Sequence, residues 1–378
     1  MMSQARIDTV LKLFQDAGHL TVEPPILQPA NTFLDLTGED IRRRLFLTNG
    51  PDGSDLCLRP DFTIPVCRQH LELGDAGRRA DYCYSGPVFR QRAQGSGEIP
   101  QLGAESLGRD DRDEADADML GLAVAALDVF GIRDRDILIG DETLFASVLS
   151  GLDLPAVWQR RLRDLFGETD KLSAAIGRMA GTDRSCDDTR DVRLGFLAAL
   201  EGADPEAAHA VVEDLLSIAG ISAVGGRTPS EIADRFLEQA ALANGSGNHA
   251  RAAEVLKSFL AIRGNAADSL SALENFAGET GLDLSEAIAG YRNRLDAIRA
   301  RNIDPAGLTF AADFGRRLDY YTGFVFEIHS KNGEAGGQLV GGGRYDRLVK
   351  LLGAGTEVPA IGFSIWLDRI ARISGRSQ

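Results

Sequence analysis

Two groups of polar residues, placed among β-like runs at opposite ends of the sequence, are the feature that most constrains this fold. The first group runs from Leu58 to Glu105 and reads LRPDFTIPVCRQH, DYCYSGPVFRQR and QLGAESLG. The second lies in GRRLDYYTGFVFEIH and is followed by GGGRYDRL and AIGFSIWLDRI. A few charged and aromatic groups that converge on one place are typical of ligand pockets. We therefore expect one pocket, built from distant parts of a single sheet.

Composition narrows the classes of protein that the sequence can encode. The chain has 378 residues, of which 44% are hydrophobic and 26% charged, so two or three globular domains are expected. The formal charge of -15 disfavours broad binding to nucleic-acid backbones, because like charges repel. The four cysteines and five histidines lack metal-ligand spacing, which predicts free buried thiols and no metal site. The first residues lack a secretion-signal pattern, and no apolar run is long enough to cross a bilayer, which predicts a cytoplasmic protein without a membrane partner.

The pattern of apolar residues predicts a mixed α+β core that is interrupted by a helical insertion. Short β-like runs separated by turns rich in Gly, Pro and Asp lie before residue 145 and after residue 305. Helix-patterned Ala, Leu and Arg dominate the sequence between these two regions. A final helix is expected from Phe363. The expected parts are a first half of the core at 1–152, the insertion at 153–300 and a second half of the core at 301–378.

Four polar residues of the first group are candidate ligand contacts. Asp61 and Thr63 follow an expected strand in LRPDFT, where a carboxylate could hold a ligand ammonium. Taken alone, a strand-end turn with a surface ion pair explains LRPDFT better. Gln101 and Glu105 lie four residues apart on an expected strand and therefore share one face. A buried, unpaired polar group costs about 1–3 kcal/mol, so a polar ligand would suit this face if it is not simply exposed to solvent.

Arginines and tyrosines supply the remaining candidates. Arg90 and Arg92 have the spacing of one strand face, and arginine suits bidentate binding of phosphate or carboxylate. A solvated face is the alternative, which we favour for Arg92. Tyrosines next to Arg316 precede a later strand, where they line a pocket or belong to ordinary aromatic core. These tyrosines are Tyr320 and Tyr321.

The C-terminal segments give weaker signals when each is taken alone. Arg369 lies in an expected helix, and a lone helical arginine is normally a surface residue. The glycines of GGQLVGGGRYDRL fit neither of the common nucleotide-binding patterns. They favour close backbone packing beneath a pocket.

Taken together, these segments resemble the catalytic core of class II aminoacyl-tRNA synthetases, and specifically the histidyl branch. The segments LCLRPDFT, YSGPVFRQR, QLGAESLG, RRLDYYTGFVFE, GGGRYDRL and PAIGFSIWLDR occur in that family's order. The resemblance covers roughly residues 5–145 and 305–375. It implies a mixed, mainly antiparallel sheet flanked by helices.

The resemblance also implies roles for individual residues. The ammonium and imidazole of histidine would be held by Asp61, Thr63, Gln101 and Glu105. Tyr320 and Tyr321 would wall the imidazole, and Arg316 would lie near the carboxylate. Arg90 and Arg369 match the two arginines that grip the phosphates of ATP, and they would be vestigial phosphate-binding residues here.

Three departures point away from a synthetase. The sequence ends at Gln378, where a histidyl synthetase continues into an anticodon-binding domain. The loop RQRAQGSGEIPQ is short and carries Arg92 where the family has an acidic residue. The acidic balance suits tRNA poorly. A chain that keeps the amino-acid pocket but lacks the tRNA machinery resembles a synthetase-like family, the regulatory subunits of ATP phosphoribosyltransferase. The segment ILIGDETLFASVLSGLDLP also resembles that family.

This second resemblance implies a noncatalytic function. It implies a homodimer that binds histidine as a feedback ligand, without cofactor or tRNA, and that works with a short-form catalytic subunit in the first step of histidine biosynthesis. The alternatives are a histidine-activating enzyme or truncated histidyl-tRNA synthetase, and a scaffold whose pocket is a relic.

Overall fold

Two compact units make up the chain in the computed structural model. The structure describes residues 4–36, 39–93, 95–180, 249–316, 320–331 and 337–374. The first unit comprises Met1–Val148, Phe166–Glu168 and Ser258–Gln378, and the second comprises Leu149–Leu165 and Thr169–Lys257. All the candidate site residues belong to the first unit.

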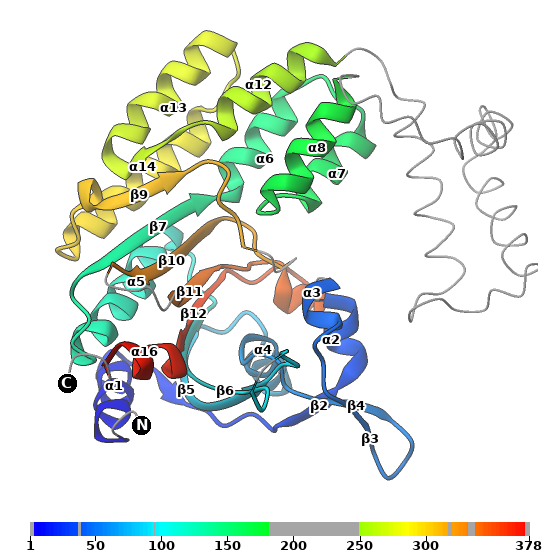
Figure 1. Cartoon of the computed structure of the whole chain (residues 1–378), viewed down its shortest axis with the longest axis vertical. Coiled ribbons are helices and arrows are strands. Elements are labelled where there is room, and N and C mark those ends of the chain that lie inside the picture. Colours follow the sequence, from blue (N-terminus) through cyan, green and yellow to red (C-terminus); the bar gives the residue numbers. More distant parts are fainter. Residues whose placement is uncertain are drawn as a thin grey trace, which may run out of the picture. The chain divides into compact units, whose positions relative to one another are not determined.

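A nine-stranded sheet in the order β1-β5-β6-β12-β11-β10-β7-β9-β8 forms the centre of the first unit (Figure 1). Neighbouring strands are antiparallel except for the pairs β1–β5 and β7–β9, which confirms the expected mixed, mainly antiparallel sheet. Its strands are β1 (Leu20–Thr21), β5 (Ala80–Phe89), β6 (Glu98–Leu107), β7 (Arg135–Asp141), β8 (Arg263–Asn265), β9 (Leu308–Ala311), β10 (Phe324–Ser330), β11 (Gln338–Arg344) and β12 (Ala360–Trp366). A smaller antiparallel sheet has the order β2-β4-β3 and consists of β2 (Leu27–Pro29), β3 (Leu47–Asn49) and β4 (Asp55–Leu58).

The strand order brings the two sequence groups together. β10, β11 and β12 come from the last part of the chain, yet they lie between β6 and β7. β5 and β6 form the expected hairpin, with Phe89 opposite Glu98. β12 then pairs with β6 along its length, so that Gly362 lies opposite Glu105. Residues far apart in the sequence therefore occupy adjacent strands.

The expected start of the last helix is wrong. Phe363 lies inside β12, and α16 begins four residues later and spans Leu367–Ser374. Nearly every residue of β12 is buried, because the strand pairs with β6 on one side and β11 on the other. A strand buried on both faces reads as a continuous apolar run, which periodicity alone does not separate from a helix.

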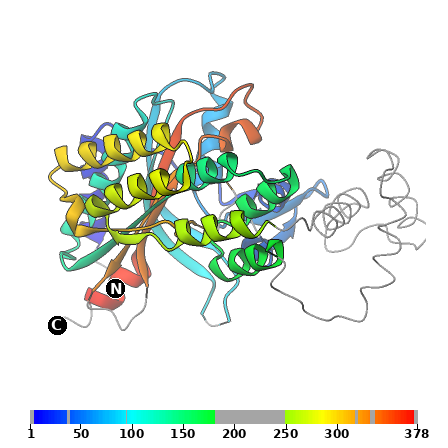
Figure 2. The same ribbon diagram turned by 90° about the horizontal axis from the view of Figure 1, so that it is seen from above.

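Helices cover the sheet of the first unit. Figure 2 shows α13 and α14 side by side, and α14 packs along α5. Within the described ranges, no helix is both long and apolar enough to span a membrane. The helices of this unit are α1 (Gln4–Asp16), α2 (Ala30–Leu36), α3 (Glu39–Arg42), α4 (Thr63–Glu72), α5 (Arg112–Val129), α13 (Ala266–Thr280), α14 (Ser285–Ala300), η1 (Pro305–Gly307), α15 (Leu348–Leu351) and α16. Two further helices, α6 (Glu142–Gly151) and α12 (Ala250–Leu260), each contain residues of both units.

A buried ion network joins α14 to the sheet. Arg294 on α14 donates to Asp116 on α5 at 2.8 Å and to Asp141 at the end of β7 at 2.5 Å. Arg344 at the end of β11 donates to the second oxygen of Asp116 at 2.5 Å and to Asp346 at 2.9 Å. All five side chains are buried. Removing one partner from such a network leaves an uncompensated buried charge.

The second unit is smaller than the insertion expected at 153–300. It ends at Lys257, and α13 and α14 belong to the first unit, where Arg294 anchors α14. In its described part, α7 (Ala156–Asp164) and α8 (Thr169–Met179) carry buried apolar side chains, among them Trp158 and Ile176. The sequence also predicts helix breaks at GTDRSCDD, EGADPE, GISAVGGRTPS and NGSGN, and these segments lie outside the described residues. Three cysteines are buried free thiols, as predicted: Cys57, Cys67 and Cys83.

Candidate functional site

Glu105 on β6 is a buried carboxylate surrounded by hydroxyl groups. Its Oε1 accepts hydrogen bonds from Thr63 at 2.8 Å and from Tyr84 at 3.1 Å, and its Oε2 accepts one from Tyr345 at 2.5 Å. Only 1% of the residue is exposed. Burial raises the pKa of Glu105 to about 7, although the three hydroxyl groups act in the opposite direction. Desolvation therefore outweighs hydrogen bonding in setting its charge.

Asp61 and Thr63 reach the same region from the start of α4. The Asp61 carboxylate accepts a hydrogen bond from the backbone N–H of Ile64 at 3.1 Å and is 6% exposed. Burial raises the pKa of Asp61 to about 6, while the nearby Arg90 acts to lower it. Thr63 contacts Glu105 directly, so the two segments of the first sequence group meet.

Two tyrosines from the second sequence group face these carboxylates. The ring centroids of Tyr320 and Tyr321 lie 5.1 Å apart, and Tyr320 meets the ring of Tyr345 edge-on at 6.0 Å. Burial, together with the charges of Asp61 and Glu105, raises the pKa of both phenols. Tyr320 and Tyr321 thus lie close enough to both carboxylates to sense their charge.

Gln101 and Arg316 carry buried polar atoms that lack partners. Gln101 is 1% exposed, and its Oε1 accepts no hydrogen bond from the described residues. The Arg316 guanidinium lies 5.5 Å from the ring centroid of Tyr321 and pairs with Glu327 at 3.3 Å. Its Nε finds no acceptor in the described part of the chain. Buried polar atoms are normally satisfied, so these atoms mark the place where a polar ligand fits.

Glycines in β11 and β12 make room for these side chains. A Cβ at position 362 would overlap Oε2 of Glu105, and a Cβ at position 341 would overlap the guanidinium of Arg316. The glycines of GGGRYD thus do support close packing beneath a pocket, as the sequence predicted, and Gly362 does the same from β12.

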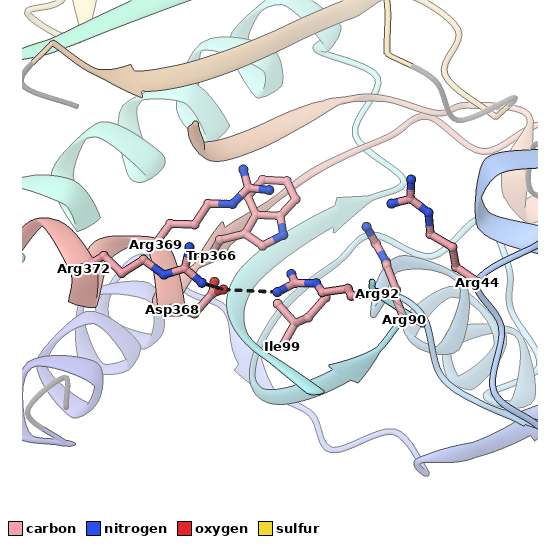
Figure 3. Close-up of a pocket in the computed structure, with 8 residues that line it drawn as sticks. All are labelled: Arg44, Arg90, Arg92, Ile99, Trp366, Asp368, Arg369 and Arg372. Carbon is pink, nitrogen blue, oxygen red and sulfur yellow. Dashed lines mark ion pairs between the residues drawn. The ribbon is translucent and has the colours of Figure 1, made fainter. Parts of the chain in front are cut away.

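An arginine-lined cavity of about 310 Å³ adjoins this cluster (Figure 3). Arg90 and Arg92 approach from the β5–β6 connection, and Arg369 and Arg372 approach from α16. Asp368 pairs with Arg92 at 3.5 Å and with Arg372 at 3.7 Å. The full lining is Arg44, Arg90, Arg92, Ile99, Trp366, Asp368, Arg369 and Arg372.

Backbone carbonyls hold the two arginines that were predicted to grip phosphates. Arg90 Nε donates to Pro60 O at 2.7 Å, and Arg369 donates to Gln338 O while lying 4.7 Å over the Trp366 ring. Burial lowers the pKa of both arginines. Arg369 is thus a partly buried cavity residue, and the surface position typical of a lone helical arginine does not apply here.

Several residues of the site escaped the sequence analysis. Tyr84 and Tyr345 lie in segments that carry the family resemblance but received no role, and Arg44 and Arg372 belong to segments without a recognisable pattern. The expectation that Arg90 and Arg92 lie on one face of a strand is also wrong, because β5 ends at Phe89 and both arginines follow it. They nevertheless line one cavity. Tyr82 and Tyr84 are two residues apart on β5 and therefore share one face of the sheet. Since Tyr82 lies opposite Glu105, this spacing was the available signal that Tyr84 lies on the same face as Glu105.

Comparison with known proteins defines the class of this fold. The model of the histidyl-tRNA synthetase family matches residues 3–224 and 210–370. The structure of a Bacillus halodurans ATP phosphoribosyltransferase regulatory subunit/histidyl-tRNA synthetase matches with a TM-score of 0.66 at 19% identity, over 98% of this chain and 78% of that chain. A Nostoc histidyl-tRNA synthetase matches with a TM-score of 0.64 at 17% identity, over 99% of this chain and 71% of that chain. The fold is that of the class II, histidyl-tRNA synthetase-like proteins.

Curated relatives narrow the class further. The ATP phosphoribosyltransferase regulatory subunits of Brucella canis and Brucella suis are each 42% identical over 360 residues, which cover 94% of this chain and 94% of the relative. The chain belongs to the family of ATP phosphoribosyltransferase regulatory subunits. The family resemblance seen in the sequence is therefore confirmed. The histidine-binding and phosphate-binding roles of individual residues stay predictions.

Proposed function

We propose that this chain is a noncatalytic subunit that binds free histidine and passes its effect to a short-form ATP phosphoribosyltransferase catalytic subunit. That partner transfers phosphoribosyl from PRPP to ATP, which is the first step of histidine biosynthesis. The proposal places the complex in the cytoplasm, without tRNA. The observation that supports it most is the pair of buried carboxylates, Asp61 and Glu105, beside polar atoms of Gln101 and Arg316 that have no partner among the described residues.

Histidine carries the hydrogen-bond donors and the acceptor that would pair with the buried polar groups of this site. Its ammonium and its ring N–H groups are donors for Asp61, Glu105 and the free Oε1 of Gln101. Its carboxylate is an acceptor for Arg316, whose Nε is unpaired among the described residues. Tyr320 and Tyr321 would flank the ring. A ligand that fills every open position gains the hydrogen bonds that the empty pocket leaves unmade.

Feedback control requires that histidine favours one state of the complex over another. Coupling of this kind is typically about 1–3 kcal/mol, which corresponds to roughly 5–150-fold in apparent affinity. A ligand with equal affinity for both states would change nothing. The proposal therefore predicts different histidine affinities in the active and inhibited complexes.

The decisive experiment measures phosphoribosyl transfer by the catalytic partner with and without this chain. We expect activity to depend on the chain and to fall when histidine is added. Glu105→Gln keeps the shape of the side chain but removes its charge, so it should abolish inhibition by histidine while the complex still assembles. Glu274→Gln, on an exposed pair with Arg292, is the matched control and should behave as the wild type. Equal activity with and without the chain would refute the proposal.

A second candidate function is histidine activation with ATP. The cavity that contains Arg90 and Arg369 favours it, because arginine clusters bind phosphates. Arg92 argues against it, because this arginine stands where the synthetase family has an acidic residue. Arg92 forms an ion pair with Asp368 instead. Histidine-dependent exchange of pyrophosphate into ATP would support this candidate. No calorimetric heat with histidine, combined with intact partner binding, would instead indicate a scaffold with a relic pocket.

A further inference from the structure

Three separate elements hold the carboxylate of Glu105. Thr63 donates from α4, Tyr84 donates from β5, and Tyr345 donates from the turn after β11. Thr63 is among the predicted histidine contacts, whereas Tyr84 and Tyr345 are not. Both tyrosines are almost fully buried. Their hydroxyl groups thus act on Glu105 and have no route to solvent.

The number of donors leaves one position open. An ionised carboxylate offers about four acceptor positions, two on each oxygen. Thr63 and Tyr84 occupy both positions on Oε1, and Tyr345 occupies one on Oε2. Tyr84 is itself fixed, because its ring stacks on Phe62 at 4.1 Å and its hydroxyl meets Ser364 at 2.9 Å. Oε2 thus keeps one acceptor position without a donor among the described residues, and it lies close to Gly362.

Glu105 also forms no ion pair with any of the residues that the structure describes, since its contacts there are the three hydroxyl groups. The hydroxyl groups that contact it are neutral, whereas the arginines of the same region, Arg90 and Arg316, act on Asp61 and on Tyr320 and Tyr321. Buried charges are normally paired, so a bound cation would complete this site. The titratable groups that act on Glu105 from the surrounding elements are Asp61, Cys67, Tyr84, Tyr320, Tyr321 and Tyr345.

We propose that Tyr84 and Tyr345 are positioning residues, which favour the ionised form of Glu105 and leave it one acceptor position, so that the pocket takes its ligand ring as the imidazolium cation. The inference rests on the proposed binding of histidine and specifies the form in which histidine is bound. The ring N–H donates to Oε2, and the positive charge of the ring offsets the charge of Glu105. At alkaline pH, where free imidazole is neutral, the ring must take a proton from the solvent to bind.

Proton uptake is therefore the quantity that tests this inference. Calorimetry of histidine binding near pH ~8, in buffers of different ionisation enthalpy, gives the number of protons taken up per ligand. We expect a value near one for the wild-type protein. Tyr345→Phe removes a donor that favours the ionised form of Glu105. In this variant Glu105 is therefore more often protonated before histidine binds than it is in the wild type. The variant should bind histidine roughly ten-fold more weakly and take up fewer protons.

Tyr82→Phe is the matched control. Tyr82 is a buried tyrosine on β5, the strand that also carries Tyr84. Its hydroxyl forms a hydrogen bond with His70 at 2.9 Å, so this change also removes a buried hydrogen bond. It leaves in place the three hydroxyl groups that donate to Glu105, so proton uptake should not change. An equal change in Tyr82→Phe and Tyr345→Phe would overturn the inference, since it would show a general loss of structure.

Other outcomes separate this inference from the proposed function. Histidine binding to the wild type without proton uptake would refute the imidazolium form and leave the proposed function standing. No histidine binding at all would refute the proposed function itself. Tyr84→Phe provides an independent test of the second hydroxyl. If neither phenylalanine variant folds, the nitrogen NMR shifts of ring-labelled histidine bound to the wild type still decide between the two forms of the ring, because they report the protonation of the ring itself.

Discussion

Glu105 links the charge of the candidate pocket to the stability of the protein. Burial raises the pKa of Glu105 from 4.5 to about 7, so the folded protein holds a proton on this group over a range where the unfolded chain does not. A group of this kind contributes stability below its unfolded pKa, and that contribution is lost as the pH rises through the folded pKa. Asp61, with a pKa raised to about 6, acts in the same direction over a lower range.

The free energy of unfolding of the ligand-free protein should therefore fall between about pH 5 and pH 8, with Glu105 contributing on the order of 1–3 kcal/mol. Glu105→Gln should remove that part of the slope, and a smaller slope from Asp61 should remain. Urea denaturation at several pH values measures the effect. An unchanged slope in the variant would show that Glu105 titrates normally in the folded state.

The sequence predicted the strand positions of Gln101 and Glu105 better than it predicted the groups that hold them. The spacing of Gln101 and Glu105 places both on one strand, and both are buried on β6. Tyr84 and Tyr345 could not be assigned in the same way, because their contacts with Glu105 arise from the pairing of strands that are distant in the sequence. A buried tyrosine in isolation has the same pattern whether its hydroxyl contacts a carboxylate or a backbone carbonyl.

At the scale of elements, Arg294 is the residue that fixes α14 to α5 and β7. Replacing it with alanine would leave Asp116 and Asp141 buried with less compensation. Breaking a buried pair in this way costs about 3–5 kcal/mol. The same substitution at Arg292, which lies on the same helix and forms an exposed pair with Glu274, should cost less than about 1 kcal/mol.

Thermal or urea unfolding of Arg294→Ala and Arg292→Ala measures this difference. Similar losses in the two variants would contradict the anchoring role of Arg294. The network also explains why the boundary of the insertion was hard to predict. α14 has the same helical composition as the residues before it, and its assignment to the sheet-containing unit comes from tertiary contacts, among them those of Arg294 and the ring contact of Tyr291 with Phe310.

The strands that are bounded by clear turn signals were the ones that the sequence predicted well. β5, β6 and β10 coincide with expected strands, and their turns carry the expected glycines and prolines. β12 was partly taken for helix, because burial on both faces erases alternation. Its identity as a strand depends on β6 and β11, which supply hydrogen-bond partners on both sides.

At the scale of the whole molecule, we expect a homodimer that forms through the segment TVEPPILQP. Three large apolar side chains in or next to this segment are exposed, namely Leu20 at 65%, Ile26 at 42% and Leu27 at 50%. Exposed apolar groups that lie close together mark interaction surfaces. Leu27→Glu should therefore shift the protein from dimer to monomer in sedimentation equilibrium.

Leu351→Glu is the control for this prediction, because Leu351 is 58% exposed on α15, in another part of the sequence. It should leave the dimer intact. A wild-type protein that sediments as a monomer would refute the expected assembly, and dissociation by both variants would show that added charge, rather than its location, is responsible.

The order of strands in the large sheet has a consequence for synthesis of the polypeptide on the ribosome. β6 and β7 follow each other closely along the chain, but three strands made much later must enter between them. Until those strands emerge, β6 and β7 each present an edge with no neighbour, and unpaired edges invite association with other chains. Sheets that depend on such distant pairings also fold slowly. The nascent protein thus passes through a vulnerable interval that ends only when Ala360–Trp366 becomes available.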